Sequence, residues 1–376
     1  MTIVIAAGGT GGHLYPAVAL AREFLRRDPA TRTLFVGTRR GIESKVLAHE
    51  GLPLELITAN PVMGKSLWEA VRGLLSVPVG LWQSLRILRR SRADLVIGVG
   101  GYTSPTMLTA AAMKGIARVI LEPNAYPGMA NKAVAPFAQR IFLAFDSAAA
   151  SFDRKKVKVV GMPVRREFLE QAAGAPKTGS EPAGQRLLIF GGSQGARMIN
   201  SAIIEGLALL KAAVPQLKIT HQTGEWDHRR VSDAYRQAGL TAEVVPFLYD
   251  MPKALRAADL VVARSGAMTI AEVTACGKPA VLIPLPTAIY DHQTKNARAM
   301  EAAGGALVLP QSGLTGARLS EVIIALLRDA PRLQTMREKS WGMRRTDAAE
   351  VIVRECYALM GVRHDANRTV GAAGVQ

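Results

Sequence analysis

Short apolar runs rich in β-branched residues alternate along this chain with longer segments rich in alanine and leucine. Apolar runs of this length are typical of strands buried on both faces of a parallel sheet, and the longer segments have the length of helices. The strands predicted in the first half are Ile3–Ala6, Thr33–Val36, Leu54–Ile57, Leu95–Val99, Val119–Glu122 and Arg140–Phe145. Those predicted in the second half are Leu187–Phe190, Lys218–Gln222, Glu243–Val245, Leu260–Ala263, Ala280–Ile283 and Ala306–Leu309.

This alternation predicts an α/β protein made of two doubly wound domains. The 376 residues, 49% of them hydrophobic, are enough for two cores of ordinary size. We expect the first domain to span residues 1–160 and to be joined by about 341–360, where a last helix packs back across it. The second domain is expected at 161–340. Residues 172–185 are typical of an exposed loop, and 361–376 of a disordered tail.

The composition limits the classes of partner. A net charge of +17 predicts an anionic partner but does not choose among nucleic acid, anionic lipid and phosphorylated substrates. Cys276 and Cys356 belong to no metal or redox motif, which fits a reduced cytoplasmic compartment. The uncharged stretches 1–21 and 95–113 are interrupted by glycine motifs, so neither is expected to be a signal peptide or a membrane span.

Three glycine-rich loops follow predicted strands: GGTGGH at 8–13, GVGGY at 98–102 and GGSQGA at 191–196. The first and third precede the predicted helices Leu14–Arg27 and Arg197–Ala213. Backbone amides at a helix start form an anion site, and glycine lets a phosphate approach closely. Each loop alone could be a tight turn. Together, in both halves of the chain, they predict anions held in a cleft between the domains.

A dinucleotide site is the alternative interpretation of the first loop. Gly9 and Gly11 fit the start of the GxGxxG fingerprint, but Leu14 stands at the third glycine position and no acidic ribose-binding residue follows at the expected place. Arg39 and Arg40 could bind the extra phosphate of NADP. An NADP-binding oxidoreductase therefore remains an alternative.

Seven motifs occur in the order found in the MurG family. They are GGTGGHLYPAVALA (8–21), GVGGYTSP (98–105), GMPVRREF (161–168), GGSQGA (191–196), HQTG (221–224), RSGAMTIAE (264–272) and DHQTKNA (291–297). The chain resembles this family up to about Met360. The resemblance implies the GT-B fold, two Rossmann-like domains facing across a cleft. It also implies inverting transfer of N-acetylglucosamine from UDP-N-acetylglucosamine to the undecaprenyl-linked muramyl-pentapeptide lipid I, giving lipid II for peptidoglycan.

The resemblance also implies roles for individual residues. His13, at a helix N-terminus whose dipole favours the neutral imidazole, is the candidate base, and Glu122 is a second candidate. Leu121 and Pro123 replace the usual His and Gln beside Glu122, so the roles of those two side chains are not carried over. The other expected substrate contacts are Thr10, Gly11, Gly12, Asn124, Arg165, Ser193, Gln194, Leu248, Ala267, Met268, Thr269, Glu272 and Gln293, with Asn296 as a further candidate.

Among these, Ser193, Gln194 and Arg165 are expected at the diphosphate, and Gln293 at the sugar or diphosphate. Glu272 is expected to accept from both ribose hydroxyls, although Thr269-x-x-Glu272 also fits a capping box that begins a helix. Asp291 and His292 are adjacent, which is poor chelate geometry, so we expect no obligatory metal and no cofactor.

Residues 65–92 combine apolar bulk, tryptophan and clustered arginine. Pro78 is expected to break them into two short helices. This pattern predicts shallow binding to an anionic membrane surface, with an ordinary buried helix as the alternative. The expected location is the cytoplasmic side of the inner membrane, peripherally bound. Cell-wall and division proteins are further candidate partners, and nucleic acid is not expected because no stacking motif is present.

Alternatives on the same fold are a diacylglycerol glycosyltransferase and a UDP-sugar epimerase. A non-catalytic membrane-docked scaffold is a third reading, which leaves the glycine loops in both halves unexplained.

Overall fold

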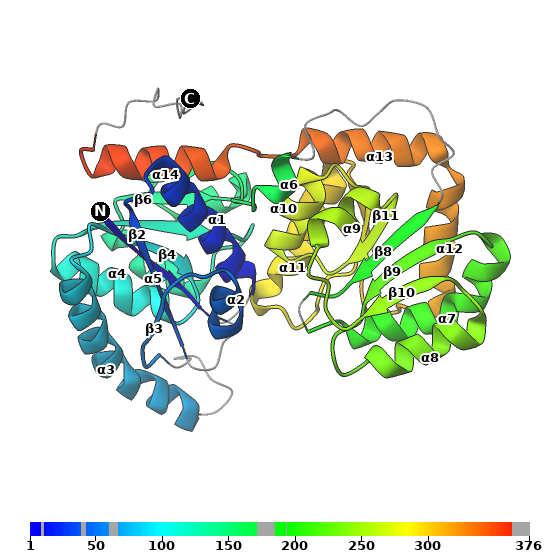
Figure 1. Cartoon of the computed structure of the whole chain (residues 1–376), viewed down its shortest axis with the longest axis horizontal. Helices are drawn as coiled ribbons and strands as arrows, with labels where there is room; N and C mark the ends of the chain where they lie inside the picture. The colour runs from blue at the N-terminus through cyan, green and yellow to red at the C-terminus, as the bar shows by residue number, and fades with distance from the viewer. Residues whose placement is uncertain (9–10, 39–42, 60–66, 171–184, 193, 363–376) are drawn as a thin grey trace, which may run out of the picture.

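Two parallel β-sheets, each covered by helices on both faces, lie side by side in this protein (Figure 1). The computed structural model describes residues 1–8, 11–38, 43–59, 67–170, 185–192 and 194–362. Thr10, Arg39, Arg40, Ser193 and the predicted loop and tail at 172–184 and 363–376 lie outside the described residues. The predicted α/β class with two doubly wound domains is confirmed.

The first sheet has the strand order β3-β2-β1-β4-β5-β6-β7 and the second β10-β9-β8-β11-β12-β13. The strands of the first sheet are β1 (Thr2–Ala7), β2 (Arg32–Gly37), β3 (Leu54–Leu56), β4 (Leu95–Gly100), β5 (Ala117–Glu122), β6 (Arg140–Leu143) and β7 (Val157–Val159). Those of the second are β8 (Arg186–Phe190), β9 (Lys218–Gln222), β10 (Ala242–Val245), β11 (Leu260–Ala263), β12 (Ala280–Leu282) and β13 (Ala306–Val308).

Helices follow most of the strands. In the first domain they are α1 (Gly11–Arg27), α2 (Glu43–His49), α3 (Leu67–Ser91), α4 (Thr103–Met113), α5 (Met129–Val134) and the 3-10 turns η1 (Ala135–Phe137) and η2 (Asp146–Ser151). After it come α6 (Glu167–Glu170), α7 (Arg197–Ala213), α8 (His228–Ala238), α9 (Met251–Ala257), α10 (Ala267–Ala275), η3 (Ile289–Asp291), α11 (His292–Ala302), α12 (Gly316–Arg328), α13 (Ala330–Gly342) and α14 (Ala348–Leu359).

Alternate residues of each central strand enter cores on opposite faces of its sheet. In β1, Ile3 and Ile5 pack with α1 and α14, whereas Val4 and Ala6 pack with α3 and α4. In β8, Ile189 packs with α7, α8 and α12, whereas its neighbour Leu188 packs with α9, α10 and α11. This two-sided burial explains why the strands are continuous apolar runs.

The last helix, α14, leaves the second domain and packs against α1 in the first (Figure 1). Its Ile352, Val353 and Cys356 are buried in the same core as Ile3 and Ile5. The chain therefore passes between the domains twice, once after β7 and once before α14.

Contacts within the described residues also join the domains near β5. Asn296 accepts a hydrogen bond from the backbone N–H of Ala125 at 3.0 Å. The Tyr126 ring lies 5.5 Å from that of Tyr290, and the Lys295 ammonium lies 3.8 Å from the Tyr126 centroid. These contacts hold one end of the boundary between the domains.

Two details of the predicted elements were wrong. Strand β7 was not predicted, because Lys158 interrupts its short apolar run; it pairs with β6 at the edge of the first sheet. Pro78 does not divide its segment, since α3 runs continuously from Leu67 to Ser91 with Pro78 inside. A proline removes one helical hydrogen bond and bends a helix without having to end it.

Candidate active site

A cleft of about 1840 Å³ opens between the two sheets, at the carboxyl ends of their strands. Ligands of doubly wound sheets bind at this edge. Gly8 and Gly101 line it from the first domain, and Gly191, Gly192 and Gly195 line it from the second. All three glycine loops thus meet at one cavity, as their positions after strands predicted.

Most of the predicted site residues that the structure describes also line this cleft. They are Gly12, His13, Asn124, Arg165, Gln194, Leu248, Ala267, Met268, Thr269, Glu272 and Gln293. Gly11 begins α1 beside them. Glu122 and Asn296 are not among the lining residues.

His13 is the third residue of α1 and lines the cleft. The His13 ring packs against Gly100. A Cβ added to Gly100 would lie 2.9 Å from His13 Nε2, so residue 100 has no room for a side chain. Burial, and then the charge of His292, lower the pKa of His13 to about 4. The imidazole is therefore neutral near pH 7, the form that can accept a proton.

His292 also lines the cleft, although its sequence position suggests only a possible metal ligand. It is the first residue of α11, and the two residues before it have left-handed backbones, with φ of 56° at Tyr290 and 52° at Asp291. Such strain in non-glycine residues gathers at functional sites. In the described ranges, no three His, Cys, Asp or Glu side chains are grouped to hold a metal.

Glu122 is buried beneath the loop that follows β5 and is held there by hydrogen bonds. It is 1% exposed, and its carboxylate accepts hydrogen bonds from the Asn124 and Gly128 backbone N–H groups at 2.9 and 3.1 Å and from Asn131 Nδ2 at 2.9 Å. These bonds give Glu122 a role in shaping the loop that carries Asn124. Its role as the second candidate base stays a prediction.

The substituted positions beside Glu122 differ in where they lie. Leu121 is buried in the core of the first domain, and Pro123 lines the cleft. Replacement of the usual His thus adds to the core, whereas replacement of the usual Gln gives the cleft an apolar wall.

Arg165 supplies a cation to the cleft. Its guanidinium lies 5.0 Å from the Tyr15 ring and 5.2 Å from that of Phe168, which fixes it between the domains. Its Nε is buried and has no hydrogen-bond partner among the described residues. A buried donor without a partner is costly, and an anionic ligand would remove that cost.

Glu272 is not a capping residue. The N-cap of α10 is Gly266, so Thr269 lies inside the first turn and the proposed capping box is wrong. The Glu272 side chain, 8% exposed, lines the cleft instead. Burial raises its pKa to about 7, against the lowering effect of Arg165.

The remaining candidates divide between binding and architecture. Gln194 lines the cleft just ahead of α7, whose N-cap, Ala196, has no polar side chain, so the first backbone N–H groups of the helix could bind a ligand. Gln293 holds the loop at Leu285 by accepting its backbone N–H at 3.0 Å. Asn296 is fully buried, accepts from the Ala125 N–H and donates to the Ser265 carbonyl at 3.3 Å, so its side chain supports the cleft from behind the lining residues.

Family models agree with the two halves of the fold. The N-terminal domain of glycosyltransferase family 28 matches residues 3–143, and the C-terminal domain of that family matches residues 186–352.

Curated relatives match almost the whole chain. One from Syntrophus aciditrophicus is 44% identical over 358 residues, covering 95% of this chain and 98% of the relative. One from Geobacter metallireducens is 45% identical over 355 residues, covering 94% and 98%. Both are named UDP-N-acetylglucosamine--N-acetylmuramyl-(pentapeptide) pyrophosphoryl-undecaprenol N-acetylglucosamine transferase.

Solved structures give the same answer. The crystal structure of Acinetobacter baumannii MurG superimposes with a TM-score of 0.74 at 28% identity, covering 95% of this chain and 99% of that one. A UDP-N-acetylglucosamine 2-epimerase, at 13% identity and a TM-score of 0.66, shares the fold alone. With both domain models matched and such relatives along its length, the chain belongs to the UDP-N-acetylglucosamine--N-acetylmuramyl-(pentapeptide) pyrophosphoryl-undecaprenol N-acetylglucosamine transferases of glycosyltransferase family 28.

Proposed function

We propose that this chain transfers N-acetylglucosamine from UDP-N-acetylglucosamine to the muramyl sugar of undecaprenyl-linked muramyl-pentapeptide, with inversion at the anomeric carbon. The observation that carries the proposal is the division of the cleft. A neutral His13 faces it from the first domain, while the glycine loop before α7, Arg165 and Glu272 face it from the second.

The donor would lie on the second domain, for which we propose residues 161–340. Glu272, as a carboxylate, would accept from the ribose hydroxyls beside Leu248 and Met268. The diphosphate would lie at the start of α7, where the helix dipole and the unpaired Nε–H of Arg165 stabilise the charge of the leaving UDP.

The acceptor would lie on the first domain, for which we propose residues 1–160 and 341–360. As the muramyl hydroxyl adds to an oxocarbenium-like carbon, its oxygen becomes a strongly acidic oxonium. An imidazole with a pKa of about 4 is basic enough to take that proton, and its neutral form is present at pH 7. In the same displacement the bond between the anomeric carbon and the diphosphate breaks on the opposite face, so that UDP leaves with the bonding electrons and the configuration is inverted.

We also propose that α3 rests on an anionic membrane surface and that the protein works peripherally on the cytoplasmic side of the inner membrane. Within the described side chains of α3, Val79 and Trp82 are 47% and 60% exposed, and Arg86, Arg89 and Arg90 continue the same face. Leu81, Leu85, Ile87 and Leu88, which the sequence grouped with this surface, instead pack into the core. Ser76, Val77 and Leu81 line the near end of the cleft, which would bring the lipid-linked sugar toward His13.

None of the helices in the described ranges is both long and apolar enough to cross a bilayer.

The test is an assay with UDP-N-acetylglucosamine and the lipid-linked muramyl-pentapeptide, read by mass spectrometry. We expect a product heavier by one N-acetylhexosamine and release of UDP. Diacylglycerol and NADPH serve as competing substrates. Transfer to diacylglycerol alone, or oxidation of NADPH without sugar transfer, would contradict the proposal.

A further inference from the structure

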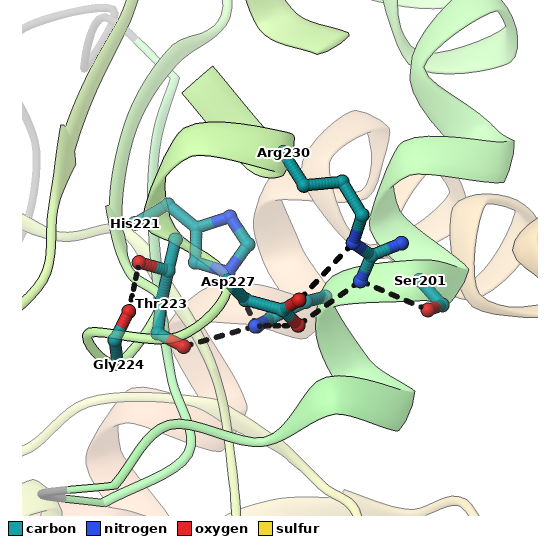
Figure 2. A network of polar contacts seen from close by, with 7 residues as sticks. Ser201, His221, Thr223, Gly224, Asp227 and Arg230 are labelled. Carbon is teal, nitrogen blue, oxygen red and sulfur yellow. Dashed lines mark hydrogen bonds and ion pairs between the residues drawn. The ribbon is translucent and has the colours of Figure 1, made fainter. Parts of the chain in front are cut away.

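A buried polar network lies beneath the third glycine loop and takes no direct part in the chemistry described above (Figure 2). Its centre is His221 on β9, which is fully buried. His221 Nε2 lies 3.1 Å from Asn200 Oδ1, in the first turn of α7. His221 Nδ1 lies 3.1 Å from the hydroxyl of Tyr235 on α8.

The partners of Asn200 fix the protons of this network. Asn200 Nδ2 donates to the carbonyl of Thr223 at 3.0 Å and to Asp227 at 2.9 Å. Its Oδ1 can only accept, so His221 must donate from Nε2 and accept from Tyr235 at Nδ1. Burial lowers the pKa of His221 to about 3, which keeps this single neutral form.

Asp227 is itself held in place from outside. Arg230 donates to both of its carboxylate oxygens, at 3.1 and 3.0 Å, and reaches Ser201 on α7 at 3.1 Å (Figure 2). The start of α7 and the start of α8 are thereby tied to each other and to the end of β9.

The third glycine loop packs against the end of β9 and the residues that follow it. A Cβ on Gly195 would lie 1.9 Å from the Thr223 carbonyl oxygen, and one on Gly224 would lie 2.2 Å from that of Gln194. Gln222 Nε2 donates to the Gly192 carbonyl at 2.7 Å. The glycine loop therefore packs directly against the Thr223 carbonyl, whose position is fixed by the hydrogen bond from Asn200.

We propose that Asn200 and His221 are positioning residues for the donor. By fixing the position of the Thr223 carbonyl, they determine how close the glycine loop and the start of α7 lie to the diphosphate of a UDP-sugar. This inference rests on the proposed function, because it assigns the network to the donor side of that cleft.

Substitutions at His221 separate its two hydrogen bonds. In His221→Gln, the side-chain Nε2 takes the place of the ring Nε2 and keeps the donor to Asn200. In His221→Asn, the amide reaches only as far as the ring Nδ1, so the donor to Asn200 is lost. Tyr235→Phe is the matched control, since it removes the other bond to the same ring, on the side away from the loop.

The measurements are the dissociation constant of UDP by calorimetry and the melting temperature of each variant. We expect His221→Asn to weaken UDP binding by about tenfold and His221→Gln to bind within about threefold of wild type. Tyr235→Phe should lower the melting temperature like His221→Asn but bind UDP like wild type. Asn200→Ser, which removes the donor to Thr223 and leaves room for a water, should weaken UDP binding like His221→Asn and serves if that variant does not fold.

The possible results are distinguishable. Wild-type affinity for UDP in folded His221→Asn or Asn200→Ser would overturn the inference and leave the proposed function intact. Equal weakening by Tyr235→Phe would also overturn it, because the network would then act only through general stability. A wild-type protein that does not bind UDP would overturn the proposed function and this inference together.

Discussion

Burial and the charge of His292 both lower the pKa of His13, at the start of α1. Because the pKa of His13 is about 4, its neutral form persists to well below pH 7. We predict that His13→Ala lowers kcat by about 10²–10⁴-fold, the usual contribution of a positioned base. The dissociation constant of UDP should change little, because the donor groups lie on the other domain. Initial rates of sugar transfer and calorimetry measure the two quantities, and a wild-type kcat in this variant would rule out the base.

Glu272 is half ionised near pH 7, because burial raises its pKa to about 7. The ionised carboxylate can accept a hydrogen bond from each ribose hydroxyl, one on each oxygen, whereas the protonated acid carries an O–H donor on one of those oxygens. We predict that affinity for UDP-N-acetylglucosamine rises between pH 6 and 8, and that Glu272→Gln weakens binding by about 10–100-fold and abolishes this rise. The sugar nucleotide is used instead of UDP because its diphosphate is esterified at both ends. It therefore has no phosphate group that changes its own charge between pH 6 and 8. Binding independent of pH in the wild type would contradict this role.

Single residues also mark what the sequence could and could not predict. The sequence could place Gln194, Arg165 and Glu272 together because their motifs are local, and all three line the cleft. The hydrogen bonds of Glu122 could not be predicted because they come from a loop whose shape no motif states, and the bond of Asn296 because its partner, Ala125, is far away in the sequence. His292 was missed for the same reason, as its effect on His13 depends on how the domains meet.

The third glycine loop leaves little room for a larger side chain. Gly195 has a φ of +73°, and a Cβ there would meet the Thr223 carbonyl. We predict that Gly195→Ala lowers both stability and UDP affinity. Gly51→Ala is the control, because Gly51 also has a positive φ, +65°, but nothing within 4 Å of an added Cβ. It should cost only the backbone strain, about 1–2 kcal/mol, with UDP affinity unchanged. Urea unfolding and calorimetry compare them, and equal losses would show that the close approach is not limiting.

Helix α3 tests the membrane proposal. Reversing Arg86 and Arg89 to glutamate should reduce binding to vesicles containing anionic lipid by at least about 30-fold, at about 1 kcal/mol for each arginine. The control reverses Arg229 and Arg236 on α8, whose side chains are 96% and 77% exposed. Sedimentation with vesicles measures both pairs at two salt concentrations. An equal loss in the control pair would mean that net charge, not α3, governs binding.

The elements themselves were largely predictable, because strands buried on both faces leave a plain apolar signal. The errors came where that signal is weak or is overridden. Strand β7 is short and carries Lys158 at the sheet edge, and Pro78 is tolerated in α3 because one side of that helix is held by the core. Where such contacts determine the ends of a helix or strand, local residue propensity does not predict them.

At the scale of the whole molecule, Ala125 joins the two domains. Its N–H donates to Asn296 across the boundary, while its carbonyl accepts from Ser147 of the first domain at 3.0 Å. We predict that Asn296→Leu, which also removes the bond from Nδ2 to the Ser265 carbonyl, lowers stability by about 1–3 kcal/mol and slows transfer. Ser147→Ala is the control, since it removes a bond to the same residue without crossing domains and should not slow transfer. Scanning calorimetry and initial rates decide this, and equal rates in the two variants would show that the bond does not orient the domains.

The return of α14 to the first domain has a consequence for exchanging parts between relatives. Ile352, Val353 and Cys356 complete the core around Ile3 and Ile5, although they come last in the sequence. A hybrid enzyme made by joining the first half of one parent to the second half of another would fit a foreign helix into that core. Residues 348–359 must therefore be inherited with the amino-terminal half, so that a workable hybrid has two junctions rather than one.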